Sequence, residues 1–273
     1  MLDREDNHYY LGQSNDALLR YQLFNRAYQA GTEQVFSWLP LATDSQVLEV
    51  GCGIGATACY MAREIVPDGH VTAFDSAADL VDCGRRTAEQ HGIDNITFVT
   101  TSAQEFECPP ASYDLVHSRY VISYLPDASK ILAMVGAALK PSGLFFGEEI
   151  AQNYMNHGDV SWYDNMTEWF AKLIEAGGGD PDYGLRQFAA DVLAAGLSIE
   201  HAAAFWPLQE QSSVRRMLAL ALSKEMKQNL TELGLATEQE VAAVLAYLKA
   251  DDVAYQISAS MAVQLVARKP QAG

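Results

Sequence analysis

The chain has 273 residues, of which 49% are hydrophobic, enough for one large domain or for a core with a smaller lid. Asp and Glu number 35 against 18 Lys and Arg, and the net charge of -17 disfavours nucleic acid and anionic membranes as partners. The sequence shows no secretory leader, no apolar run near the ~18 to 20 residues of a membrane span and no CxxC spacing, so we expect a reduced, cytoplasmic protein without structural metal.

The first forty residues, rich in Tyr and Leu, predict helices ahead of a sheet. From residue 46 onward, apolar β-rich runs alternate with helical patterns. Strands are expected at 46–50, 71–75, 96–100, 112–118 and 144–150. Helices are expected at 56–65, 77–91 and 128–139, with a break at the KPSG sequence of 140–143. This alternation predicts βαβ units and a parallel sheet covered on both faces.

The pattern changes after residue 150. The expected elements are an aromatic-rich helix ending at the glycines of 177–179, a helix at 185–195, a strand at 198–208, wholly helical residues 212–249 and a last strand at 260–269. Within the helical stretch, TEQE at 237–240 is a capping-box pattern. This helical insertion and the N-terminal helices are candidate lids over the strand ends, where open α/β sheets bind ligands.

The stretch VLEVGCGIG, which begins at residue 47, follows the first expected strand. Gly51, Gly53 and Ala56 fit the G-x-G-x-x-A form of a dinucleotide-binding turn. Two features differ from that form: Gly55 makes the spacing GxGxG, and Glu49 stands two residues ahead of the first glycine.

The stretch resembles motif I of the class I S-adenosylmethionine (SAM)-dependent methyltransferases. SAM carries no phosphate, so the resemblance implies that Gly51 and Gly53 let the backbone approach its methionine part. It also implies that Glu49 takes up the amine of the cofactor, directly or through water. The resemblance covers residues 46–150 through several motifs, which together are more specific than the glycines alone.

Asp75 ends the second expected strand and is placed to bind both ribose hydroxyls, as it would be in an NAD enzyme. TSAQEF at 101–106 lies where the family reads the adenine. Many members carry an acid at the position of Ser102, so Ala103 or Gln104 is expected to serve through backbone or amide. YDLVHSRYVISYLPD at 113–127 resembles the fourth-strand segment of the family, and this places Ser118 and Arg119 beside the cofactor.

YYLGQSNDALLRYQ at 9–22 resembles the N-terminal helix of a subgroup of bacterial small-molecule methyltransferases. In that setting Tyr10 and Arg20 close over the SAM carboxylate, while the alternative for Tyr10 is simple packing of a lid helix. The cofactor-binding residues implied by the resemblance are Tyr10, Arg20, Glu49, Gly51, Gly53, Asp75, Ser76, Ser102, Ala103, Gln104 and Ser118.

The resemblance implies an α/β fold: a seven-stranded, mostly parallel Rossmann-like sheet whose last strand is antiparallel. Helical lids are expected at the N-terminus and between the last two strands. Residues 1–40 would be the N-terminal lid and residues 41–273 the SAM-binding methyltransferase domain, with lid segments at 153–182 and 209–257.

His157, in the expected loop after the fifth strand, is the candidate general base, with a surface loop histidine as the alternative. Of Glu148 and Glu149, strand alternation turns one toward the pocket, where it would bind an amine or orient the acceptor. His117 is expected to pack or to hydrogen-bond locally. Asp114 has no paired Asp-Asn companion at the place where some catechol methyltransferases hold magnesium, so no metal is expected.

An aromatic set after the fifth strand admits two interpretations, a helix core or a substrate box. Its members are Tyr154, Trp162, Tyr163, Trp169 and Phe170. A substrate box would imply an apolar or aromatic acceptor that is partly buried.

The leading hypothesis is a methyltransferase that moves a methyl group from SAM to O, N or C of a small, apolar or aromatic molecule by in-line displacement, leaving S-adenosylhomocysteine (SAH). One alternative is a SAM-binding protein that does not methylate, such as a cyclase, a pericyclase or a regulatory partner. Another is an NAD(P) oxidoreductase, which would lack the antiparallel last strand. The expected partner is a small-molecule acceptor, not nucleic acid or a membrane, and a homodimer is left open.

Overall fold

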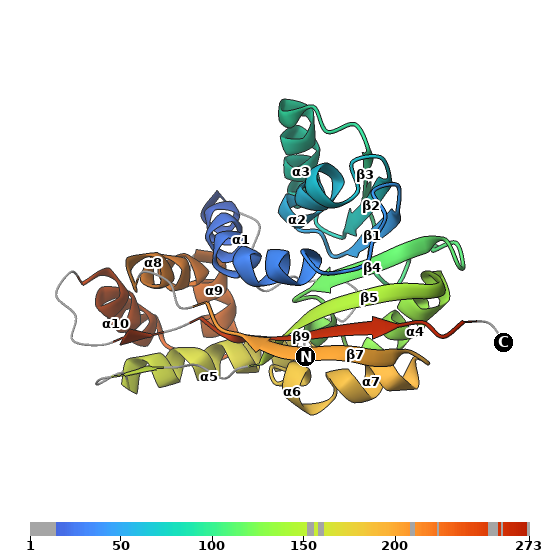
Figure 1. Cartoon of the computed structure of the whole chain (residues 1–273). Coiled ribbons are helices and arrows are strands. Elements are labelled where there is room, and N and C mark those ends of the chain that lie inside the picture. Colours follow the sequence, from blue (N-terminus) through green and yellow to red (C-terminus); the bar gives the residue numbers. More distant parts are fainter. Residues whose placement is uncertain are drawn as a thin grey trace.

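The computed structural model describes residues 15–151, 156–157, 161–207, 211–222, 224–250, 256–257 and 259–271. In this part of the chain a central sheet carries helices on both faces, and a group of further helices extends beyond one end of it (Figure 1). Within the same residues no helix combines the length and the apolar character that crossing a membrane requires.

Seven strands form the central sheet in the order β3-β2-β1-β4-β5-β9-β7. Their bounds are β1 Gln46–Val50, β2 His70–Asp75, β3 Ile96–Thr100, β4 Tyr113–Arg119, β5 Leu139–Ala151, β7 Ser198–Phe205 and β9 Met261–Arg268. The strands β1 to β5 pair in parallel, and β9 lies antiparallel between β5 and β7. The predicted Rossmann-like sheet with an antiparallel last strand is therefore confirmed.

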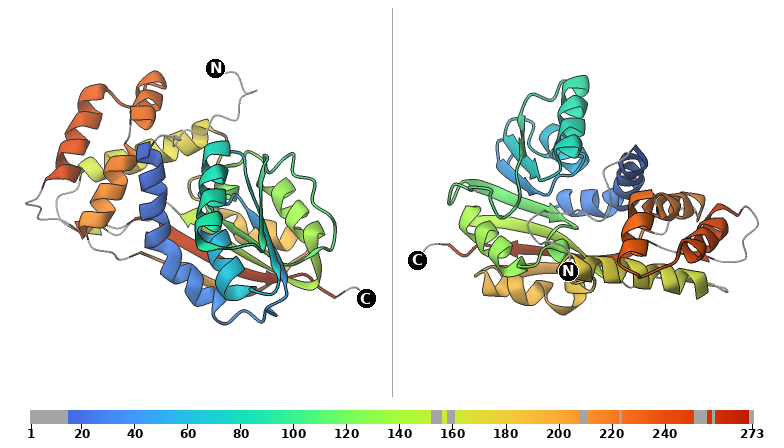
Figure 2. Two further views of the ribbon diagram at one scale, coloured as in Figure 1. Left: turned by 90° about the horizontal axis from the view of Figure 1, so that it is seen from above. Right: turned by 180° about the vertical axis from the view of Figure 1, so that it is seen from behind.

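Two layers of helices cover the sheet (Figures 1 and 2). One layer holds α1 (Asn15–Phe36), α2 (Ala56–Tyr60) and α3 (Ala78–His91), and the other holds α4 (Ala128–Ala138), α6 (Tyr183–Arg186) and α7 (Phe188–Ala194). Side chains alternate along each strand. Val47 and Phe146 therefore join the core under the first layer, while Leu48 and Phe145 join the core under the second.

Four more helices form a lobe beyond the carboxyl ends of β5 and β7 (Figure 2). They are α5 (Ser161–Ala176), α8 (Gln211–Ala221), α9 (Lys224–Glu232) and α10 (Glu238–Lys249). A short antiparallel pair accompanies them, formed by β6 (Asn156–His157) and β8 (Gln256–Ile257). The predicted capping box at the start of α10 is confirmed, because the Thr237 hydroxyl accepts from the Glu240 N–H and the Glu240 carboxylate accepts from the Thr237 N–H. The lobe shares one apolar core with Tyr28 of α1.

Several expected helices are interrupted. The helix expected at 56–65 continues past Tyr60 as a π-helical turn (Met61–Ile65), where the side-chain amide of Asn95 donates to the carbonyls of Ala62 and Val66. Residues 212–249 hold α8, α9 and α10 rather than one continuous helix. Gly234, with φ of 67°, follows α9 in the left-handed conformation that ends helices.

The break predicted at KPSG is wrong in its extent, because β5 already begins at Leu139. Tyr113 pairs with Leu139 and Leu115 with Leu144, so β5 accommodates three more residues than β4 over this interval. Ser142 takes a φ of 65° within this irregular stretch. The backbone bulges there and then resumes regular pairing, as an irregular strand does.

Candidate functional site

Three glycines with positive φ form the turn after β1, and each has its own reason. A Cβ on Gly51 (φ 69°) would lie 2.2 Å from Cγ2 of Val121. A Cβ on Gly55 (φ 72°) would lie 2.7 Å from the ring of Phe98. Gly53 (φ 51°) has no heavy atom within 4 Å of its Cβ position, so its backbone borders open space. The turn thus leaves a ligand free to approach the backbone at Gly53.

Asp75 ends β2 beside this turn, and its carboxylate accepts two backbone hydrogen bonds. Oδ2 accepts from the N–H of Gly53 at 2.9 Å, and Oδ1 accepts from the N–H of Ala77 at 3.0 Å. Burial raises the pKa of Asp75 above its ordinary value, against these stabilising bonds. Each carboxylate oxygen has a further lone pair for a pair of hydroxyls. Ser76, the next residue, is exposed.

The loop after β3 carries the residues expected to meet the adenine. Ser102 is buried, and its hydroxyl donates to the Glu105 carboxylate at 2.8 Å. Ala103 is partly buried against the same core as Val121, while Gln104 is exposed. The loop therefore keeps Ser102 and Ala103 largely inside and leaves Gln104 at the surface.

Besides Nδ1 of His117, two buried oxygen atoms near the carboxyl ends of β1 and β4 are among the described side-chain atoms without a hydrogen-bond partner. They are Oε2 of Glu49, whose residue is 3% exposed, and the hydroxyl of Ser118, whose residue is 0% exposed. Glu49 pairs in register with His117 and therefore lies on the α1 face, whereas Ser118 lies on the opposite face. Because burying an unpaired polar atom is costly, both atoms are suited to receive a ligand donor.

Glu49 also belongs to a buried polar network on the α1 face. Its Oε1 lies 3.4 Å from Nδ1 of His117, and Nε2 of His117 lies 3.4 Å from Oε2 of Glu148. Glu148 further accepts from the hydroxyl of Thr32 at 2.8 Å and from the amide of Gln264 at 2.7 Å. His117 packs against the ring of Phe36, in line with the expectation of a packing role, and its ring also lies between carboxylates of two further strands. The available signal was a polar residue at matching positions of otherwise apolar strands.

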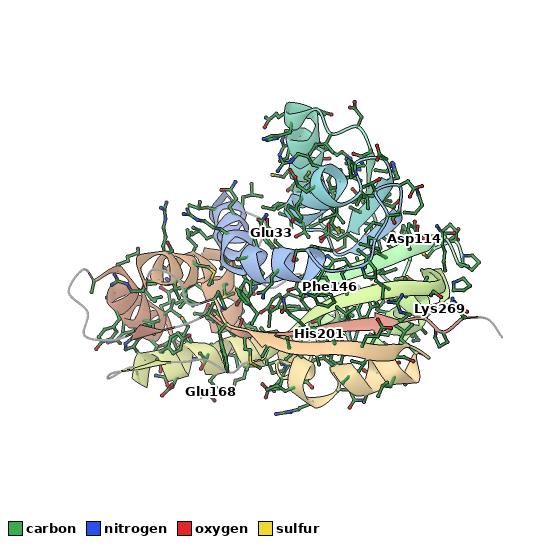
Figure 3. All side chains as sticks on the ribbon, viewed as in Figure 1. Glu33, Asp114, Phe146, Glu168, His201 and Lys269 are labelled. Carbon is green, nitrogen blue, oxygen red and sulfur yellow. The ribbon has the colours of Figure 1, made fainter. Side chains whose placement is uncertain are left out.

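Arg119, at the end of β4, is the cation of the site. Its guanidinium donates to the Thr32 hydroxyl at 3.0 Å and to the Asn25 side-chain carbonyl at 2.6 Å. Arg119, Thr32 and Thr57 line a hollow between α1 and α2 that is too narrow for a water molecule. Glu33 borders the same hollow from α1 (Figure 3).

The two N-terminal candidates lie elsewhere or outside the described residues. Arg20 is 7% exposed in α1, and its guanidinium lies 4.5 Å from the centroid of the Tyr21 ring. The residues of α1 that line the hollow are nine or more positions further along the helix, beginning at Gln29. Tyr10 lies outside the described residues.

The remaining catalytic candidates separate by position. His157 lies in β6, and its side chain is outside the described residues. Glu149 faces away from α1 and accepts from the N–H groups of Ile122 at 2.9 Å and Ser123 at 3.0 Å. Burial raises the pKa of Glu149 to about 7 in spite of these bonds. Glu149 therefore fixes the turn after β4, whereas Glu148 belongs to the network under α1.

The aromatic set of α5 lies largely in the core of the lobe. Trp162, Tyr163 and Trp169 are 7%, 0% and 6% exposed and pack with apolar residues of α8, α9 and α10. Phe170 is partly buried against the same core, and Tyr154 lies outside the described residues. The helix-core interpretation accounts for the three buried rings.

Asp114 lies near the start of β4, at the end of the sheet away from the lobe (Figure 3). Its Oδ2 accepts from the backbone N–H of Gln46 at 2.8 Å and from Nζ of Lys140 at 2.7 Å. This carboxylate ties three strands together and takes no part in the site.

Comparisons with known proteins agree with this geometry. Residues 47–143 match a family model described as a methyltransferase domain. Over 99 residues the chain is 31% identical to demethylmenaquinone methyltransferase of Listeria welshimeri, a match covering 36% of this chain and 42% of that protein. The chain thus matches less than half the length of this relative.

Two solved structures resemble nearly the whole chain. Phosphoethanolamine N-methyltransferase 2 of Haemonchus contortus, in complex with phosphomonomethylethanolamine and SAH, gives a TM-score of 0.62 at 18% identity, covering 97% of this chain and 60% of that one. The cyclase SpnF gives a TM-score of 0.60 at 18% identity, covering 90% of this chain and 82% of that one. At 18% identity, these similarities show a shared fold and nothing more.

Proposed function

We propose that this protein transfers a methyl group from SAM to O, N or C of a small organic molecule, because residues 47–143 match the family model of a methyltransferase domain and the chain has the fold of solved SAM-dependent methyltransferases. The observation that carries the proposal is the pairing of an open turn at Gly53 with the buried, unpartnered Oε2 of Glu49. A cationic, phosphate-free cofactor fits this combination.

Different residues would contact the different parts of SAM, beginning with its methionine part. Glu49 would accept the amine of the methionine part, and the backbone at Gly51 and Gly53 would border that part. Arg119 would bind the carboxylate, because it is a cation at the end of β4. Arg20 would need α1 to shift for the role that the sequence predicts for it.

The adenosine part would lie along the next strands. Asp75 would accept both ribose hydroxyls with the lone pairs that its backbone bonds leave. Ser76 would lie beside the ribose, and the base would lie against Ala103, with Ser102 and Gln104 at its polar edge. Ser118 would offer its unpartnered hydroxyl from β4.

When bound, SAM supplies an electrophilic methyl group on a positively charged sulfur. The protein's main task is then to hold the acceptor in line with that group, and positioning of this kind can contribute about 7–11 kcal/mol. A base adds to the rate only where the acceptor atom carries a proton. We propose His157 for that role, because β6 follows β5 at the carboxyl edge of the sheet.

We propose that the acceptor is apolar or aromatic and enters between the sheet edge and lids formed by residues 1–40, 153–182 and 209–257, with residues 41–273 as the SAM-binding domain. The net charge of -17 supports a small molecule over nucleic acid. The name of the Listeria relative, which refers to a quinone precursor, is in keeping with an aromatic acceptor. A cytoplasmic location is part of the same proposal.

A second candidate function is a SAM-dependent cyclase that does not methylate, favoured by the likeness to SpnF over 90% of the chain. The cofactor site described above serves binding equally well in both cases. Formation of SAH distinguishes the two functions, because a methyltransferase converts SAM to SAH during turnover and a cyclase leaves SAM unchanged.

Calorimetric titration with SAH, and in parallel with NADH, tests the cofactor assignment. The proposal predicts saturable binding of SAH and no binding of NADH. Tight NADH binding without SAH binding would instead support an oxidoreductase.

A further inference from the structure

Four neighbouring strands carry buried polar side chains on the sheet face that α1 covers. Glu49 of β1 stands beside His117 of β4, and Glu148 of β5 stands beside Gln264 of β9. These four residues, referred to below as the row, are between 0% and 4% exposed. The ring of Phe36 of α1 lies 5.4 Å from the imidazole of His117, which closes the face to water. Burying polar groups in such a place is costly unless they are paired, and Oε2 of Glu49 and Nδ1 of His117 have no hydrogen-bond partner among the described residues.

His117 faces a carboxylate at each ring nitrogen, at 3.4 Å on both sides. A neutral imidazole can donate from one nitrogen only, whereas an imidazolium donates from both. Burial lowers the pKa of His117, but the carboxylates of Glu148 and Glu49 outweigh burial and raise it above the ordinary value. Burial likewise opposes the charge of Glu148, but His117 and Arg119 hold its pKa below the ordinary value.

The other charged and titratable groups near these four side chains do not change the direction of the pKa shifts of His117 and Glu148. Arg119 is the further cation, from β4, and it balances Glu148. The thiols of Cys52 and Cys59 face Glu49, and burial raises the pKa of both, so they stay neutral. The phenols of Tyr28 and Tyr120 face Glu148, and burial raises their pKa values as well.

The row continues into α1 through one hydroxyl. Thr32 donates to Glu148 at 2.8 Å and accepts from Arg119 at 3.0 Å. The same helix joins two cores, since Tyr28 packs in the core of the lobe and Phe36 in the core under the first helical layer. A change in the charge or position of Glu148 therefore alters the contacts of α1, the helix that packs against the lobe.

We propose that His117 is a positioning residue that ties Glu49 to α1 through Glu148, so that cofactor uptake and the seating of α1 on the sheet depend on each other. This inference rests on the proposed function, because it takes Oε2 of Glu49 as the acceptor for the cofactor's amine. Nδ1 of His117 faces Oε1 of Glu49 at 3.4 Å, and Oε2 of Glu49 is left without a partner among the described residues. Thr32 makes the seating of α1 sensitive to the charge on Glu148.

The first experiment measures the SAH dissociation constant by calorimetry from pH 6 to pH 8.5 for the wild type and for His117→Gln. The amide keeps a polar group but cannot titrate, and losing a buried charged partner should weaken binding about tenfold or more at pH 6. Wild-type affinity should fall as pH rises through the raised pKa of His117, whereas His117→Gln should lack that fall. The amino group of SAH titrates equally in both titrations.

A matched pair of α1 variants tests the link to the helix. Thr32→Val removes the donor to Glu148 and should weaken SAH binding about fivefold, the effect of one buried hydrogen bond. Tyr28→Phe removes a buried hydroxyl of the same helix, which donates to the carbonyl of Ser260 at 2.6 Å and not to Glu148. It should lower the free energy of unfolding by a similar amount and leave the SAH dissociation constant within about twofold.

These outcomes separate the two claims. If the wild type binds no SAH, the proposed function fails. If the wild type binds SAH, and His117→Gln keeps both its affinity and its pH profile, the role of His117 is wrong. Should His117→Gln not fold, equal SAH affinities for Thr32→Val and Tyr28→Phe overturn the inference by themselves.

Discussion

Gly51 and Val121 stand so close that a Cβ on the glycine would lie 2.2 Å from Cγ2 of the valine, while Gly53, two residues on, borders open space. The first glycine is required by the protein's own packing. The second glycine leaves the backbone accessible to a ligand that binds against the turn.

This difference predicts opposite effects of two matched substitutions. Gly51→Ala combines a positive φ with a clash and should lower the free energy of unfolding by about 2–4 kcal/mol. Gly53→Ala adds only the positive φ and should cost about 1 kcal/mol, yet it should weaken SAH binding at least tenfold. Urea unfolding and calorimetry measure the two effects. Wild-type SAH affinity in Gly53→Ala would show that the cofactor does not approach this backbone.

A pH prediction follows from Glu149, whose pKa burial raises to about 7 from an ordinary 4.5. Between these values the folded protein holds a proton that the unfolded chain has released. The associated stability is complete below about pH 4.5 and is lost as pH rises through about 7. Glu149→Gln cannot titrate, so its free energy of unfolding should fall less than that of the wild type between pH 5 and 7.5, by up to about 2–3 kcal/mol. Parallel slopes in urea titrations would contradict this.

Asp114 gives a prediction about metal. Its carboxylate holds Lys140 and the backbone of β1, and both side chains of the pair are about one third exposed, at 33% and 38%. Asp114→Asn should therefore cost at most about 1 kcal/mol of stability. It should leave the SAH dissociation constant unchanged, and a chelator should do the same. A loss of turnover in EDTA that added magnesium restores would show that the chemistry needs a metal.

His157 remains a prediction of the sequence, and its test needs an identified acceptor. His157→Ala should leave SAH binding intact and lower turnover about 100-fold for an acceptor that must lose a proton. His91→Ala is the matched control, because His91 lies on α3 with its Nδ1 beside the carbonyl of Thr87. Unchanged turnover in His157→Ala would remove it from the mechanism.

The fold was predictable from sequence where one strand or one turn carries its own signal. The bounds of β1 and β3 match the apolar runs, and Thr237 with Glu240 marks the start of α10. KPSG misled because Pro141 and Gly143 usually end an element, whereas here the backbone bulges and resumes pairing. The helix expected at 185–195 is instead divided at Gln187 into α6 and α7.

Some contacts of the candidate site were likewise predictable from the sequence, and others were not. Gly51, Gly53 and Asp75 lie in or beside one turn, so their spacing in the sequence already predicts their meeting. The row from Glu49 through His117 to Glu148 joins three strands separated by tens of residues. Only the register of the sheet brings these side chains together, and Thr32 joins them from a helix 116 residues before Glu148.

The most direct test of methyl transfer uses methyl-labelled SAM incubated with the protein and the small-molecule extract of its source cell, beside a tube with the RNA and protein fraction. The account predicts label in one small compound and an equal amount of SAH. Label confined to macromolecules would contradict the small acceptor. Consumption of a small compound without label or SAH would contradict methyl transfer and support the cyclase.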